Sequence, residues 1–324
     1  MLINPVSPSA TERGPAPRRA RRARLLGSAL LLLPLLASAG TWSVSDDEGR
    51  TLTLSAPAQR IVSLSPGATA LLFAAGAGAQ IVGTSEYSTE PEAAKNIPRV
   101  GDSQSFDSER ILSLHPDVVI AWVDGTPAAQ IARIERLGIP VYRHHVQRLD
   151  DLAVSIRRLG QLAGTQAVAQ TSATALEQQL RQIRARFHSA RPPSILIQIW
   201  QSPVYTVGSG ELLSDALASC GYRNLYGDLS AASPAVTLES VLARAPEVIL
   251  ALAPDEASAA QWLAQWRRFP AIPAVAHDRL IGFWDQALSR FGPATVTATA
   301  ALCTALRSAS PPPEAAVVVP PAGA

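Results

Sequence analysis

Short apolar segments alternate with helical patterns along most of this chain, and this alternation constrains the fold more than any other feature. In the first half the strand-length apolar segments are residues 61–64, 81–84, 118–122 and 141–144. Helical patterns separate them, as at 69–75 and at 127–137, where we expect Thr126 to cap the helix and Gly138 to end it. Before them, two short segments flank the turn-forming Asp46-Asp47-Glu48-Gly49 and predict a hairpin. The pattern indicates parallel βαβ units.

The second half repeats this scheme. Its strand-length segments are 195–200, 248–252 and 280–283, and its helical patterns are 212–219, 256–267 and 294–307. Residues 107–121 return as 237–251 at a constant displacement of 130, with a Glu, a Pro and an apolar strand at the same places. Chance repetition of a common βαβ pattern is the alternative. The constant spacing favours two pseudo-symmetric α/β lobes.

Segment 150–190 joins the predicted lobes, which span 40–149 and 191–309. It carries no strong strand pattern, and residues 166–188 are rich in Ala, Gln, Leu and Arg. A continuous helix over 166–188 would be about 35 Å long at 1.5 Å per residue. The sequence therefore predicts two Rossmann-like α/β lobes joined by a single long backbone helix, with a ligand cleft between the lobes.

The first 39 residues carry the pattern of a secretory signal peptide. Arginines between Arg18 and Arg24 precede an apolar run at 25–36, and Ala37-Ser38-Ala39 fits an A-x-A cleavage site. The run is shorter than the roughly 20 residues that span a bilayer, which argues against an anchor. We expect Sec or Tat export to the periplasm with cleavage near Ala39, and a disordered Pro- and Ala-rich tail at 310–324.

Charge and motif content exclude several function classes. Without residues 1–39 the chain has 22 basic and 25 acidic residues and a net charge of −3, so no nucleic-acid surface is expected. Lys95 is the only Lys and follows no glycine-rich turn, which excludes a Walker A loop. Gly208-Ser209-Gly210 lacks the nucleophile-elbow pattern, and no HExxH or CxxC motif is present. We predict a protein without catalytic residues or a catalytic cofactor, and not an enzyme.

Five histidines raise metal capture as an alternative function. Only the adjacent His144 and His145 lie near a predicted strand end, and neighbours on a strand point to opposite faces. No metal-ligand set is therefore expected.

Two cysteines, Cys220 and Cys303, belong to a chain predicted for an oxidising compartment, where pairing is the usual outcome. A disulfide between them would stabilise the fold by roughly 4 kcal/mol in the chain-entropy model. Two buried free thiols are the alternative.

Aromatic residues gather at the carboxyl ends of the predicted strands. Tyr87, Trp122, Trp200 and Trp284 all end or follow such a strand. Ligand sites of open α/β sheets form at these ends. Core packing is the alternative for any single residue, but four equivalent placements favour a cleft lined by flat apolar surfaces.

Three motifs carry a resemblance to a known family. They are RIVSLSP at 60–66, VGTSEYS at 82–88 and the segment 109–122, and the likeness continues through 213–215 and Cys220-Gly221 to Cys303. The chain thereby resembles the periplasmic cobalamin-binding proteins of vitamin ABC importers, in the helical-backbone (class III) group of substrate-binding proteins. Haem and siderophore receptors share much of this pattern.

The resemblance implies that two lobes joined by a rigid helix hold a corrinoid between them. The predicted ligand-binding residues are Tyr87, Trp122, Trp200, Tyr205, Trp284, Asp285 and Arg290. The paired cysteines of the family fall on Cys220 and Cys303. The chain departs from the family at Ala70, where an acidic residue is usual, and at Ser233-Pro234-Ala235, where a Trp is expected.

Glu109 and Glu239 occupy the same place in the two copies of the repeat, each as the third residue of a predicted short helix. A plain N-terminal helix charge is the alternative, but the resembling family docks matching glutamates onto transporter arginines. We expect a monomer that captures cobalamin, or a related corrinoid, and delivers it to an ABC transporter permease. A haem or iron–siderophore receptor, a metal-ion binding protein and an enzyme on this fold are the alternatives.

Overall fold

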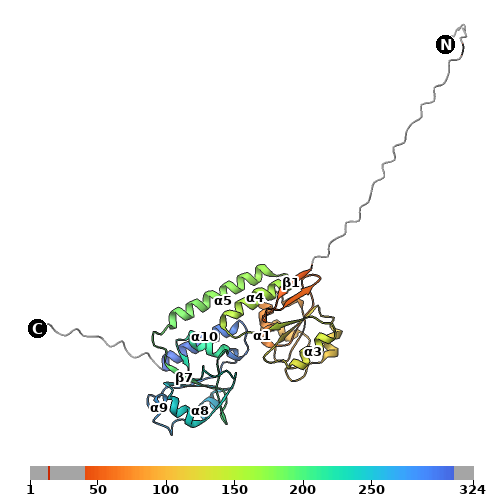
Figure 1. The fold of residues 1–324 in the computed structure, drawn as a ribbon. Helices are drawn as coiled ribbons and strands as arrows, with labels where there is room; N and C mark the ends of the chain where they lie inside the picture. Colours follow the sequence, from red (N-terminus) through yellow and green to blue (C-terminus); the bar gives the residue numbers. More distant parts are fainter. Residues whose placement is uncertain (1–13, 15–40, 310–324) are drawn as a thin grey trace, which may run out of the picture. The chain divides into compact units, whose positions relative to one another are not determined.

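A computed structural model of the chain describes residues 41–309 and the single residue Gly14. The predicted signal peptide at 1–39, apart from that glycine, and the predicted tail at 310–324 lie outside the described residues. Two four-stranded sheets, one in each lobe, organise the described part (Figure 1). Within residues 41–309, no helix is both long and apolar enough to cross a bilayer.

The N-terminal lobe is built on a parallel sheet in the order β4-β3-β5-β6. These strands are β3 (Ile61–Ser63), β4 (Ile81–Thr84), β5 (Val118–Trp122) and β6 (Val141–His144), as the sequence predicts. Its helices are α1 (Pro66–Ala74), α2 (Ser108–Ser113) and α3 (Ala128–Arg136), with short 3₁₀ turns η1 (Gly78–Gln80) and η2 (Glu92–Asn96). The predicted hairpin is confirmed by antiparallel pairing of β1 (Trp42–Ser45) with β2 (Thr51–Leu54).

The expected cap of α3 is wrong. Pro127, with non-helical backbone angles, stands at the cap position and no side chain caps the helix. Thr126 is buried in the turn after β5, where its backbone N–H donates to the carbonyl oxygen of Trp122 at 2.8 Å.

The C-terminal lobe is built on a parallel sheet in the order β12-β11-β7-β9. Its strands are β7 (Ser194–Gln198), β9 (Arg223–Asn224), β11 (Val248–Leu252) and β12 (Leu280–Phe283), and β8 (Val204–Tyr205) pairs antiparallel with β10 (Ala235–Val236). Its helical elements are α6 (Leu212–Ser219), α7 (Leu238–Arg244), α8 (Glu256–Ala264), α9 (Pro273–Ala276), η3 (Gln286–Ser289) and α10 (Ala294–Ala309). β7 ends before the expected Trp200, because Trp200 pairs with Tyr205 in an antiparallel bridge instead.

The two sheets have the same topology. The order of strands across one sheet corresponds to the order across the other: β4, β3, β5 and β6 correspond in turn to β9, β7, β11 and β12. The predicted 130-residue displacement relates α2 to α7 at their first residues and relates the whole of β5 to the whole of β11. The repeat is therefore confirmed as a structural correspondence between the lobes.

The linking segment consists of two helices, α4 (Leu149–Ala163) and α5 (Gln166–Phe187), which pack side by side (Figure 1). Gly164 ends α4 in the left-handed conformation, at φ 76°, and so permits the sharp reversal between them. α5 is about 33 Å long at 1.5 Å per residue. It contacts α1 and α4 and also α6 and α10 of the C-terminal lobe, which confirms the predicted backbone helix.

Asp215 of α6 ties the C-terminal lobe to these two helices. Its carboxylate accepts the backbone N–H of Leu149 at 2.9 Å and lies 3.2 Å from Arg148 and 3.5 Å from Arg184. Arg184 of α5 also pairs with Asp150 of α4 at 2.9 Å. These contacts fix the junction from both helices.

Candidate ligand-binding cleft

A cavity of about 420 Å³ lies at the carboxyl ends of the N-terminal sheet. It is lined by residues 64–67, 85–87, 102–104, Trp122, Gly125 and His144 of the N-terminal lobe and by residues 289–291 of the C-terminal lobe. Because parallel strands end at one edge of a sheet, segments that are distant in sequence converge there. Its size is within the usual range for small-molecule sites.

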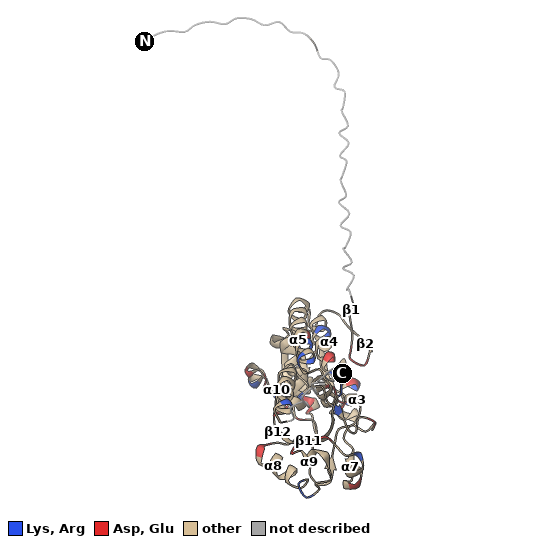
Figure 2. Ribbon diagram, turned by 90° about the vertical axis from the view of Figure 1, so that its left-hand side faces the viewer, with Lys and Arg blue, Asp and Glu red and all other residues tan. Residues whose placement is uncertain are grey.

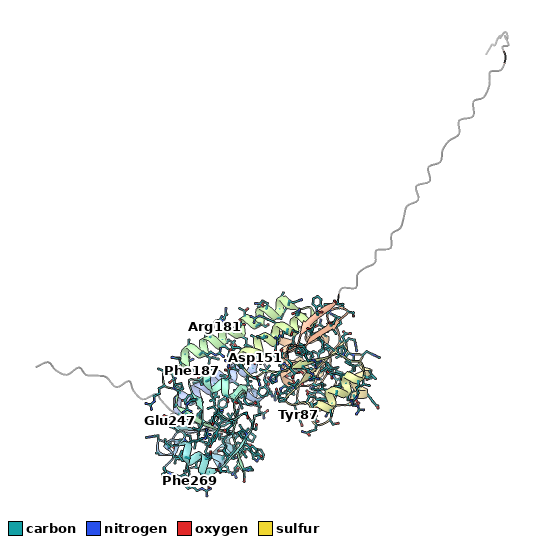
Figure 3. All side chains as sticks on the ribbon, viewed as in Figure 1. Tyr87, Asp151, Arg181, Phe187, Glu247 and Phe269 are labelled. Carbon is teal, nitrogen blue, oxygen red and sulfur yellow. A yellow bond between two sulfur atoms is a disulfide. The ribbon has the colours of Figure 1, made fainter. Side chains whose placement is uncertain are left out.

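Tyr87, Trp122 and Phe291 supply the aromatic part of this cavity. Trp122 is half-buried, and its ring meets the edge of Phe291 with centroids 5.5 Å apart. Tyr87 is 74% exposed, and Figure 3 shows it at the edge of the N-terminal lobe that faces the C-terminal lobe. Large apolar surfaces are therefore available for contact with a flat ligand.

The backbone around these rings is constrained. Tyr87 and Phe291 both adopt left-handed conformations, at φ 63° and 54°, which cost about 1–3 kcal/mol each in residues other than glycine. Gly125 leaves room for the ring of Trp122, with which a Cβ at that position would collide. Such local strain often accompanies functional sites.

Arg290 connects the two lobes at the cavity. Its Nη1 donates to Thr89 Oγ1 at 3.2 Å and to Glu90 Oε1 at 3.1 Å. Beneath it, Gly67 of α1 lies so close that a Cβ there would collide with the carbonyl oxygen of Arg290. The C-terminal lobe thus touches the N-terminus of α1 through its own backbone.

The structure brings together Tyr87, Trp122 and Arg290 of the predicted ligand-binding set. The other four predicted residues, Trp200, Tyr205, Trp284 and Asp285, are not among the residues that line this cavity. Trp200 and Trp284 are exposed by 57% and 46%, and the Trp200 ring packs edge-on against Trp262. The Asp285 carboxylate accepts the backbone N–H of Ala287 at 2.9 Å and so begins η3.

His144 is a cavity residue that the ligand prediction did not include. Its Nδ1 lies 2.8 Å from Asp47 Oδ2, and the carboxylate of Asp47 also accepts hydrogen bonds from Tyr142 at 2.7 Å, Ser155 at 2.9 Å and Arg158 at 3.0 Å. Burial alone would raise the pKa of Asp47, but these partners, His144 first among them, lower it to about 2. The imidazole is therefore held in one orientation by an ionised carboxylate.

The side chain of His145, which directly follows β6, points to a different carboxylate. Its Nδ1 lies 2.9 Å from Asp124 Oδ2, to which the indole N–H of Trp122 also donates at 3.1 Å. Burial, and then the charge of Asp124, raise the pKa of Glu211 on the C-terminal lobe. Within residues 41–309, no three His, Cys, Asp or Glu side chains are grouped as metal ligands would be.

Phe291, Ser85 and His144 line the cavity but were missed, although the sequence contained a signal for Ser85 and His144. Ser85 directly follows β4, and His144 ends β6, so both occupy the strand ends where ligand residues are expected. Phe291 adjoins Arg290 but follows a 3₁₀ turn, and its contact with Trp122 joins residues that are distant in sequence.

Glu109 and Glu239 are exposed and lie on α2 and α7. Each is the second residue of its helix and not the third, because Asp107 and Thr237 stand at the cap positions outside the helices. Hydrogen bonds from its own backbone and from Thr237 lower the pKa of Glu239. Charged residues of both signs are interspersed over the two lobes, and α7 itself carries both (Figure 2).

The predicted disulfide is confirmed. Cys220 and Cys303 are bonded with their Cα atoms 4.8 Å apart, and both are buried. The bond joins the end of α6 to α10 within the C-terminal lobe.

Comparison with known proteins identifies the family. A model of the periplasmic binding protein family matches residues 61–287. A vitamin B12-binding protein of Vibrio cholerae is 33% identical over 253 residues, which cover 78% of this chain and 91% of that protein. A vitamin B12-binding protein of Vibrio campbellii is 32% identical over 247 residues, which cover 76% of this chain and 89% of that one.

Solved structures show the same fold. The crystal structure of the periplasmic vitamin B12-binding protein of Vibrio cholerae matches with a TM-score of 0.70 and 33% identity, over 78% of this chain and 98% of that chain. The periplasmic haem-binding protein of a Roseiflexus species matches with a TM-score of 0.64 and 27% identity, over 78% and 98% of the two chains. The chain therefore belongs to the periplasmic binding protein family, in its helical-backbone class.

Proposed function

We propose that this chain captures cobalamin, or a closely related corrinoid, in the periplasm and delivers it to the permease of an ABC importer. The observation that carries the proposal is the convergence of Tyr87, Trp122 and Arg290 on one cavity, although they come from three separate segments. The vitamin B12-binding relatives, up to 33% identical over most of the chain, give this cavity its proposed ligand class.

The chemistry of the cavity suits a flat macrocycle with polar side groups. The faces of Tyr87 and Trp122 offer apolar contact, which contributes roughly 1–3 kcal/mol for each ring that the ligand buries. Arg290 offers guanidinium donors to carbonyl groups at the ligand edge, once it exchanges its contacts with Thr89 and Glu90 for contacts with the ligand. We retain the four predicted residues outside the cavity, Trp200, Tyr205, Trp284 and Asp285, as contacts of a ligand larger than the cavity.

The remaining parts of the proposal concern processing and delivery. A signal peptide cleaved near Ala39 would release a monomer with lobes at 40–149 and 191–309, linked by 150–190. Glu109 and Glu239 would dock onto basic residues of the permease, since both carboxylates are exposed and equivalent in the two lobes. No catalytic step and no catalytic cofactor enter this scheme.

A haem receptor is the second candidate. The observation in its favour is the 27% identity to a periplasmic haem-binding protein of the same fold. Haem is also flat and would find the same aromatic surfaces, so the cavity chemistry alone is compatible with both ligands.

Absorbance separates these ligands. Purified protein is incubated with cobalamin, haem or a ferric siderophore, freed of unbound ligand and scanned, because each ligand has its own visible spectrum. We expect the cobalamin spectrum to be retained at one ligand per chain. Retention of haem alone would overturn the corrinoid proposal in favour of the second candidate.

The cavity itself is tested by Trp122→Ala. We expect a loss of roughly 1–3 kcal/mol of binding free energy, or about 5- to 150-fold in Kd, measured by titration calorimetry. Trp42→Ala is the control, because Trp42 lies in β1 and does not line the cavity. Unchanged affinity in Trp122→Ala would show that the ligand binds elsewhere.

A further inference from the structure

We propose that Leu112 and Leu242 form, together with Glu109 and Glu239, two equivalent contact points for the two-fold related halves of a membrane permease. The inference rests on the proposed function and extends it. It assigns an apolar component to a docking surface that the proposed function describes only by its two charges.

Exposure is the first observation. Leu112 is 45% exposed and Leu242 is 38% exposed, and neither belongs to a buried core cluster. Large apolar side chains are exposed at several other places, but these two are the pair that occupies equivalent elements, α2 and α7, at the 130-residue displacement. A single exposed leucine is ordinary on a protein surface. A second exposed leucine at the equivalent position of the other lobe indicates that both have the same role.

The orientation of the two helices is the second observation. Ile111 and Val241, which are equivalent to each other, are fully buried in the cores of their lobes. Because these two side chains point into the cores, the opposite side of each short helix faces solvent. Residues three apart share a helix face, so each leucine lies beside the glutamate that precedes it by one turn. Each lobe therefore carries one carboxylate and one leucine as neighbours on its surface.

The charges of these two surfaces are available to a partner. Among the residues that the structure describes, no ion pair involves Glu109 or Glu239. The residues that follow them differ, Arg110 in one lobe and Ser240 in the other. At the equivalent positions of α2 and α7, the glutamate and the leucine are the residues that are identical in the two lobes.

The partner that fits these two contact points carries two copies of a complementary surface. It offers, on each of two symmetric halves, a basic side chain beside an apolar surface, because a monomer with two equivalent contact points is complementary to a two-fold symmetric surface. In such contacts an apolar centre excludes water and the charged group lies at its rim. The leucines would therefore govern how long the complex lasts, and the glutamates would govern how fast it forms.

The test uses Leu112→Ser together with Leu242→Ser in the full mature protein. Binding of ligand-free protein to the importer permease of the source organism, held in lipid nanodiscs, is measured by surface plasmon resonance at several salt concentrations. We expect permease affinity to fall about tenfold or more, mainly through faster dissociation, with the salt dependence retained. Glu109→Gln with Glu239→Gln should instead slow association and flatten its salt dependence.

Leu137→Ser is the matched control, because Leu137 is 43% exposed but has no exposed equivalent in the second lobe. Wild-type permease binding by the leucine double variant, or an equal loss in the Leu137→Ser control, would overturn the inference. Cobalamin binding is titrated separately. If the wild-type protein does not bind cobalamin, the proposed ligand is wrong. The permease measurement uses ligand-free protein, so it still decides the role of the leucines.

Discussion

At the scale of single residues, the buried carboxylate of Asp47 organises the side of the cleft that His144 lines. Its side chain is 1% exposed and lies in the turn between β1 and β2, yet its partners come from β6 and α4. The sequence indicated the turn but not this network, because hydrogen bonds between segments some hundred residues apart leave no local pattern. Tyr142 shows the reciprocal effect, since burial and the charge of Asp47 raise its pKa well above its usual range.

We expect Asp47→Asn to lower the free energy of unfolding at pH 7 and to remove the part of it that depends on the ionisation of Asp47. The pKa of Asp47 is about 2 in the folded protein and about 3.9 in an unfolded chain, so its ionised form stabilises the fold above pH 4. The contribution is about 2.5 kcal/mol at pH 7, about half of that at pH 3, and it vanishes below pH 2. Urea unfolding of Asp47→Asn and wild type at pH 7 and pH 3 measures the difference. A gap of equal size at both values would contradict this assignment.

At the scale of elements, the sequence predicts the helix α5 well but does not predict where every strand ends. The buried residues of α5 are Ala169, Ala173, Leu176, Leu180, Ile183 and Phe187, at alternating intervals of four and three. This periodicity is readable in the sequence and gives the helix one apolar face for both lobes. The end of β7 was not readable, because Ile199 and Trp200 continue the apolar pattern while their backbone pairs with Tyr205 across a turn.

The approach of α1 to the 290–291 segment depends on the absence of a side chain at Gly67. A Cβ at Gly67 would meet two backbone carbonyl oxygens, which cannot move aside as a flexible side chain can. We expect Gly67→Ala to lower the free energy of unfolding by about 1–3 kcal/mol in denaturant titrations. Gly227→Ala is the control, because a Cβ there meets only ordinary contacts, and it should change stability by less than about 0.5 kcal/mol. Equal stabilities of the two variants would be the adverse result.

At the scale of the whole described molecule, the sequence predicted the lobes, the linking helix and the disulfide, and it predicted the cavity in part. Strand ends were enough to find Tyr87 and Trp122, since both lie at the sheet edge where ligands bind. The contribution of Phe291 depends on how one lobe contacts the other, and the contact surfaces of two lobes carry no periodic pattern. For the same reason, the sequence did not separate the residues that line the cavity from those beside it.

The disulfide should stabilise the C-terminal lobe without taking part in ligand binding. Cys220→Ser with Cys303→Ser is expected to lower the free energy of unfolding by about 2–5 kcal/mol. Ligand affinity should remain at the wild-type level, because neither cysteine lines the cavity. Denaturant unfolding with and without dithiothreitol measures the effect, and the double variant, which has no thiol, should not respond to the reductant. Thiol titration of unfolded, unreduced wild type should find no free sulfhydryl.

The chain passes from one lobe to the other only once in the described residues, through α5. Each sheet is therefore encoded by an uninterrupted stretch of sequence, and the disulfide lies wholly within the second stretch. Because of this arrangement, the gene segment that encodes one lobe can be exchanged as a unit. Recombination between related genes at the end of α5 would exchange the C-terminal part of the cavity lining together with the disulfide, while the N-terminal part, with Tyr87 and Trp122, is inherited intact. New ligand preferences can then arise by reassortment of halves, without waiting for coordinated point mutations on both sides of the site.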